Sequence, residues 1–103
     1  MGSAAVALFV AITSHERSMA SLRITRTDLW QLHRAVDRYR AEHDGRCPEN
    51  LQVLVKKNYV SHLPKDAWGT PYVFRCPGRF DPNSYDLSSA GPDRIPGGID
   101  QIE

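Results

Sequence analysis

The feature that most restricts the fold of this 103-residue chain is a helical pattern that occupies its first 43 residues. Apolar residues recur at spacings of three, four and seven, which places them on one face of a helix. This stripe consists of Met19, Leu22, Leu29, Leu32, Val36 and Tyr39. The pattern stops at Gly45, which we expect to cap the helix, and Pro48 blocks its continuation. Only 60 of the 103 residues then remain to pack against the helix.

The start of this helix is hydrophobic on all sides, because every residue from 4 to 12 is apolar. Nine helical residues span about 13 Å, which is less than half of a bilayer core of about 30 Å. A cleaved signal peptide is a poor match, since no basic region precedes the apolar run. We expect residues 1–12 to be the inner part of a longer, truncated membrane anchor. The alternative is a helix end that docks on a partner.

Residues 13–44 form the amphipathic part of the predicted helix, and residues 45–103 have the pattern of a small globular region. A short second helix is predicted within residues 48–60, and residues 72–76 and 84–89 are β-type runs joined by a turn-rich segment. We expect the apolar stripe from Leu29 onward to form the core. Trp68 and Tyr72 lie between turn residues and could bind a ligand, but a buried tryptophan more often supplies core area. We also expect Gly69 to permit a close backbone approach, and Asp66 to accept hydrogen bonds from its own loop.

The residues that usually carry chemistry show no catalytic arrangement. The four histidines have no metal-binding spacing, and the two cysteines form no C-x-x-C pair. Neither a nucleophile–base pair nor a pair of carboxylates with catalytic spacing can be named, so we expect no enzymatic activity. Nucleic acid is not an expected partner either, because the chain lacks a concentrated basic patch.

The charge of the chain is uneven, and its end is acidic. Residues 81–103 contain five acidic residues against one arginine. These acids would repel one another in a packed turn unless a cation neutralised them. Calcium suits such a loop, because it takes six to eight hard oxygen ligands in irregular geometry. The spacing is not that of an EF-hand. The alternative is a solvated acidic tail.

Three segments, in order, resemble the major pseudopilins of type II secretion systems. "AVDRYRAEHDGRCPENLQVLV" resembles the end of their long helix, and "LPKDAWGTPYVF" resembles their L-P-x-D-x-W-G-x-P-Y segment. "YDLSSAGPDRIPGG" resembles their F-x-L-x-S-x-G-x-D-G-x-x-G-G close. The resemblance runs from about Thr25 to the last residue. The chain departs from the family in lacking the G-F-T-L-x-E signature, in carrying Arg94 where glycine is usual, and in carrying Cys47 where tyrosine is common.

The resemblance implies an α+β, pilin-like fold: a long N-terminal helix packed on a small antiparallel sheet, with a calcium loop at the C-terminus. It implies a structural subunit of the pseudopilus, held in the bacterial inner membrane through its N-terminal helix and exposed to the periplasm. Its expected partners are further copies of itself, minor pseudopilins and inner-membrane assembly proteins. A membrane-tethered periplasmic calcium- or ligand-binding module, or another type IV pilin-like subunit, is the alternative.

The resemblance also points to individual residues for the expected Ca²⁺ ion. Asp93 matches the aspartate of the family's G-x-D turn, Asp100 matches the first terminal acidic ligand, and Ala90 occupies a position that contributes a backbone carbonyl. The last ligand has no clean counterpart, so Gln101 and Glu103 are both candidates.

An oxidising periplasm favours a bond between Cys47 and Cys76, because lone cysteines in that compartment tend to pair. The alternative is two separately buried thiols.

Overall fold

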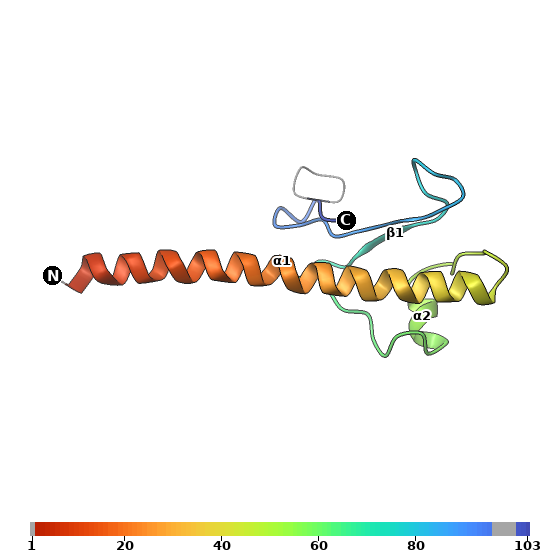
Figure 1. The fold of residues 1–103 in the computed structure, drawn as a ribbon, viewed down its shortest axis with the longest axis horizontal. Helices are drawn as coiled ribbons and strands as arrows, with labels where there is room; N and C mark the ends of the chain where they lie inside the picture. The colour runs from red at the N-terminus through yellow and green to blue at the C-terminus, as the bar shows by residue number, and fades with distance from the viewer. Residues whose placement is uncertain (1, 96–100) are drawn as a thin grey trace.

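The protein is elongated and is organised around one long helix. The computed structural model describes residues 2–95 and 101–103, with side chains from residue 19 onward. It measures 66 × 28 × 15 Å. Helix α1 (Gly2–Glu42) runs along the longest dimension, and Figure 1 shows its first half extending beyond the rest of the chain. The second half of α1 lies between α2 on one side and the strands on the other. The predicted long helix is therefore confirmed. Within the described residues, no helix combines membrane-spanning length with enough apolar character.

The C-terminus of α1 is capped by two residues in the left-handed conformation. The Gly45 N–H donates to the Arg40 carbonyl at 2.7 Å, which is the long-range bond of a Schellman motif. The residue at the cap position itself is Asp44, with a φ of 57°. Gly45 follows it with a φ of 82°. The cap is thus one residue earlier than the sequence predicted, because the short polar side chain of an aspartate tolerates this conformation.

Helix α2 (Gln52–Lys56) is shorter than the predicted segment 48–60. The Val53 N–H donates to the Asn50 side-chain oxygen at 3.2 Å at its start. The chain leaves the helix at Asn58, whose φ is 64°, and the Tyr59 N–H then closes the turn on the Leu54 carbonyl at 2.8 Å. The side chain of Asn50 therefore binds the first turn of this helix, and the left-handed conformation of Asn58 ends the helical path.

The strands form a two-stranded antiparallel sheet, as predicted. Strand β1 (Val73–Arg75) pairs with β2 (Asp86–Ser88), with Phe74 opposite Leu87. The chain continues beyond β2, and Ser89 then pairs with Ile102 through two backbone hydrogen bonds of 2.6 and 2.8 Å. The end of the chain therefore returns to the sheet instead of leaving it as a tail.

The core lies along the second half of α1, as the apolar stripe predicted. Leu29, Leu32, Val36 and Tyr39 are all 9% exposed or less. They belong to two adjoining clusters completed by Leu54 from α2, Tyr72, and Leu87 from β2. Met19, at the start of the stripe, is 46% exposed.

Trp68 belongs to neither core cluster and is only half-buried. The expectation that it would be a principal core residue is therefore wrong. Tyr72, four residues later, takes the buried position against the core.

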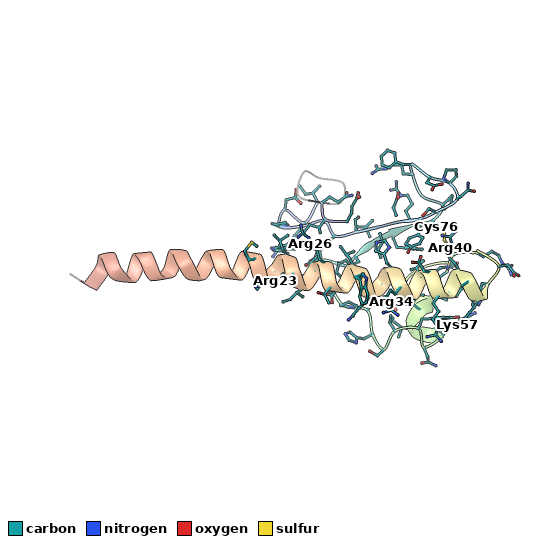
Figure 2. The ribbon with its side chains drawn as sticks, viewed as in Figure 1. Arg23, Arg26, Arg34, Arg40, Lys57 and Cys76 are labelled. Carbon is teal, nitrogen blue, oxygen red and sulfur yellow. A yellow bond between two sulfur atoms is a disulfide. The ribbon has the colours of Figure 1, made fainter. Side chains whose placement is uncertain are left out.

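A disulfide joins Cys47, just after the α1 cap, to Cys76, just after β1, with their Cα atoms 6.4 Å apart. Cys76 lies on the strand side of α1 in Figure 2. The bridge therefore ties the end of the helix directly to the sheet.

Candidate functional site: the C-terminal loop and its supports

The predicted calcium loop is closed at its base by the Ser89–Ile102 pair. Ile102 packs against the core cluster that contains Leu29 and Leu87. Side chains alternate along an extended segment, so the neighbours of Ile102 face the other way. Gln101 and Glu103 accordingly line a separate cavity of about 330 Å³.

The first part of the loop is a tight turn centred on Asp93. The Asp93 Oδ1 atom accepts a hydrogen bond of 2.9 Å from the Ile95 N–H, and the Arg94 N–H donates to the Gly91 carbonyl at 3.0 Å. Arg94 has a φ of 59°, in the left-handed region that favours glycine. Arg94 therefore occupies a backbone conformation that glycine adopts with less strain. The guanidinium of Arg94 points to the Trp68 carbonyl, to which its Nε donates at 3.0 Å.

Asp66 supports this loop through its side-chain hydrogen bonds, and the residue is only 4% exposed. Its Oδ1 accepts hydrogen bonds from the N–H groups of Trp68 at 3.1 Å and Thr70 at 2.9 Å, as predicted from the sequence. Its Oδ2 accepts a 2.6 Å hydrogen bond from the Ser89 hydroxyl. The Ser89 Oγ atom in turn accepts the Gly91 N–H at 3.1 Å. One buried carboxylate thus joins the 64–71 loop to the base of the C-terminal loop.

Gly69 is required in the turn around Asp66 for a different reason from the one expected from the sequence. A Cβ atom at Gly69 would meet nothing within 4 Å, so the expected close backbone approach is wrong. The residue has a φ of 81°, and its N–H closes the turn on the Asp66 carbonyl at 3.0 Å. Glycine is needed for this backbone conformation.

The same loop is attached to α1 by two further polar contacts. The Ala67 N–H donates to the hydroxyl of Thr25, which is fully buried, at 3.2 Å. The Tyr72 hydroxyl donates to Asp28 Oδ2 at 2.9 Å. Burial, together with this carboxylate, raises the pKa of the Tyr72 phenol well above its ordinary value. The helix, the 64–71 loop and the C-terminal loop therefore form one connected unit.

The structure brings together only part of the predicted calcium ligand set. Ala90 is buried at the start of the turn that contains Asp93, whereas Asp100 lies outside the described residues. The Gln101 Nε2 atom donates a hydrogen bond of 2.9 Å to Glu103 Oε1. Both residues line a cavity whose described walls include Arg75 but neither Ala90 nor Asp93. Within the described ranges, no three His, Cys, Asp or Glu side chains are close enough to hold a metal.

The sequence did not indicate that the Ser89 hydroxyl links Asp66 to the C-terminal loop. Its signal in the sequence is weak, because a serine at the end of a strand is common. Only the pairing with Ile102 places its hydroxyl against Asp66.

Comparisons with known proteins agree with this architecture. The family described as type II secretion system (T2SS), protein G, matches residues 12–103. The chain is 34% identical over 91 residues to the type II secretion system core protein G of Escherichia coli, covering 74% of this chain and 61% of that relative. It is 29% identical over 109 residues to the core protein G of Pseudomonas aeruginosa, covering 91% of this chain and 75% of that protein. The chain therefore spans less than two thirds of the length of the E. coli relative.

A solved structure is similar over most of the chain. The crystal structure of the major pseudopilin from the type 2 secretion system of enterohaemorrhagic Escherichia coli matches with a TM-score of 0.74 and 28% sequence identity, covering 85% of each chain. This match confirms the predicted pilin-like α+β fold. The long helix, the small antiparallel sheet and the family match over residues 12–103 lead to one conclusion: the chain belongs to the type II secretion system protein G family.

Proposed function

We propose that this protein is a structural subunit of a type II secretion pseudopilus, which polymerises through its N-terminal helix and supports protein export across the outer membrane. The observation that carries this proposal is the shape of the molecule. Half of α1 extends beyond the folded body, in a chain whose fold is that of a major pseudopilin (Figure 1). The apolar residues 4–12 in this projecting part need a covering surface, and neighbouring copies in a filament provide one.

The proposed setting is the bacterial envelope. The N-terminal helix would be held in the inner membrane before assembly, and the folded body would face the periplasm. The partners would be further copies, minor pseudopilins and the inner-membrane assembly proteins of the system. The role is mechanical and structural, without catalysis.

Assembly tests this function directly. The chain is produced together with a type II secretion assembly machinery, and filaments are counted by electron microscopy. Removing residues 1–12 should abolish filaments while the body keeps its disulfide and circular dichroism spectrum. Exchanging the exposed Lys56 of α2 for alanine serves as the control and should leave filament number unchanged. Filaments that persist without residues 1–12 would contradict the proposal.

A second part of the proposal is a bound Ca²⁺ ion in the C-terminal loop. The Asp93 Oδ2 atom makes no hydrogen bond with the described residues, and the backbone around it is held in a tight turn. The pairing of Ser89 with Ile102 returns the end of the chain to the base of this turn. We infer a ligand set of the Asp93 carboxylate, the Ala90 carbonyl and the Asp100 carboxylate, completed by backbone oxygens. Calcium accepts such a mixed set of hard oxygens.

Thermal unfolding in calcium and in EDTA tests this site. A ligand present at 100 times its dissociation constant stabilises by about 2.7 kcal/mol. For a domain of this size that is a rise in Tm on the order of 10 °C. The rise should vanish in Asp93→Ala and in Asp100→Ala but persist in Glu49→Ala, which removes an exposed acid elsewhere. An identical Tm in calcium and EDTA for the unaltered chain would refute the calcium site.

A further inference from the structure

A groove lies between α1 and the segment that follows α2. It has a volume of about 780 Å³, and its walls include Trp30, Leu32, Arg34, Arg38, Tyr59 and His62. The Arg34 guanidinium lies 4.9 Å from the centre of the Trp30 ring, and that of Arg38 lies 5.3 Å from the centre of the Tyr59 ring. Trp30 remains 57% exposed. Tryptophan, tyrosine and arginine are the residues most enriched at the energetic centres of protein interfaces.

The connection between the two strands contains an exposed turn formed by residues 78–83, which we call the tip loop. Phe80 is 86% exposed, more than any other large hydrophobic residue in the described part of the chain. The loop beneath it is ordered by hydrogen bonds. The Gly78 N–H donates to the Ser84 carbonyl at 2.8 Å, and Asp81 Oδ1 accepts the Asn83 N–H at 2.9 Å. Phe80 is therefore presented by a fixed turn.

The groove and the tip loop face opposite sides of α1. Figure 2 shows Cys76, just before the tip loop, on one side of the helix, and Lys57, just before Tyr59 of the groove wall, on the other. A tip loop therefore lies across the helix from the groove of its own molecule. A contact between the two features joins different molecules.

We propose that the tip loop of one copy docks into the groove of a neighbouring copy. Phe80 packs against the exposed faces of Trp30 and Tyr59, and the Asp81 carboxylate pairs with the Arg34 guanidinium.

The choice of a second copy rests on matching groups on the two surfaces. Asp28 also lines the groove. Arg38 is paired with Glu42 at 3.4 Å, whereas Arg34 has no ion-pair partner among the described residues. The tip loop offers an exposed carboxylate, Asp81, directly beside the Phe80 ring, which has the Arg79 guanidinium 5.1 Å from its centre.

This contact joins unlike surfaces and is therefore heterologous. A heterologous contact that does not close into a ring repeats from copy to copy and generates an open helical array. The inference rests on the proposed function, and it adds a contact between the folded bodies to the contact through the N-terminal helices.

Photocrosslinking locates the contact. A photoreactive benzoyl-phenylalanine replaces Phe80 in the full chain, and a mixture of isotopically labelled and unlabelled chain is irradiated once it has assembled. We expect crosslinks between labelled and unlabelled copies, from position 80 to peptides containing Trp30 or Tyr59. The same probe at Ile95, which is 60% exposed, is the control and should not reach the groove. Crosslinks from position 80 to other surfaces, or none in assembled material, would overturn the proposal.

Charge reversal tests the pairing, with self-association of the purified chain measured by sedimentation velocity. Arg34→Glu and Asp81→Lys should each weaken association about tenfold, as expected for a residue at an interface centre, and the double variant should recover most of this loss. Glu49→Lys should have no effect. If the double variant is no better than the singles, or if Phe80→Ala associates like the unaltered chain, the contact is wrong while assembly itself stands. If the unaltered chain neither self-associates nor forms filaments, the proposed function fails and this contact fails with it.

Discussion

Replacing Asp66 by alanine should destabilise the whole folded body, although Asp66 lies in a loop. Its carboxylate is the shared acceptor of three hydrogen bonds, two from backbone N–H groups and one from Ser89. A hydrogen bond to a charged group contributes about 1.5–3 kcal/mol. The two backbone donors lie in a half-buried loop where water can replace the carboxylate, whereas Ser89 is fully buried. We therefore expect a loss of about 3–4 kcal/mol, which is below the lower bound of about 4.5 kcal/mol for three such bonds because water replaces part of the two backbone contacts.

A loss of this size is a large share of the 5–15 kcal/mol by which domains are usually stable. The isosteric change Asp66→Asn should cost only about 1–2 kcal/mol. Its amide oxygen still accepts the backbone N–H groups, and its NH₂ group can donate to the Ser89 hydroxyl. That hydroxyl then accepts a hydrogen bond from residue 66 instead of donating one. The expected order of stability is therefore Asp66, then asparagine, then alanine.

Urea unfolding followed by circular dichroism measures these differences, provided that the slope of free energy against urea stays the same among variants. Glu49→Ala, which removes an exposed carboxylate, is the matched control and should change stability by less than about 0.5 kcal/mol. If Asp66→Ala costs no more than this control, or if asparagine is as damaging as alanine, the carboxylate does not hold the two loops together as described.

Three smaller predictions concern other parts of the molecule. Reducing the Cys47–Cys76 bridge, which spans a sequence separation of 29, should lower stability by about 3.6 kcal/mol on the chain-entropy account; equal urea midpoints with and without reductant would contradict this. Burial and the Asp37 carboxylate raise the pKa of Tyr85 above its ordinary value of 10.0. Tyr85 should therefore contribute its full stability below pH 10, and this contribution should be lost as the pH rises toward the folded-state pKa, because the unfolded chain then binds fewer protons. Tyr85→Phe should reduce the slope of unfolding free energy against pH between pH 9 and 11. An equal slope in the variant would argue against the raised pKa. Phe80→Ala should change stability by less than about 0.5 kcal/mol, because its ring is 86% exposed; a larger loss in urea unfolding would show that the ring packs within its own molecule.

The long helix and its buried face could be predicted because they depend on periodicity, which is local in the sequence. Leu29, Leu32 and Val36 recur at helical spacing and are buried as expected. The two strands were predictable for the same reason. The limits of α2 were harder to place, because they depend on side-chain and backbone geometry at Asn50 and Asn58.

The candidate site was less predictable, because it depends on register between distant segments. The pairing of Ser89 with Ile102 decides which side chains of the last residues face the core. It places Gln101 and Glu103 in a cavity away from Asp93, although all three are close in the sequence. Trp68 shows a similar limit. Its size favours burial in the core, but in the turn held by Asp66 it is only half-buried and belongs to neither core cluster.

The disulfide also determines how the molecule would carry mechanical load. A pull along α1 reaches Cys47 a few residues beyond the end of the helix and crosses the bridge directly to Cys76 at the end of β1. The 28 residues between the two cysteines, including all of α2, are bypassed by this covalent path. Tension would therefore pass from helix to sheet without stretching the α2 segment. The wall of the groove that this segment provides would keep its shape while the helix is under load.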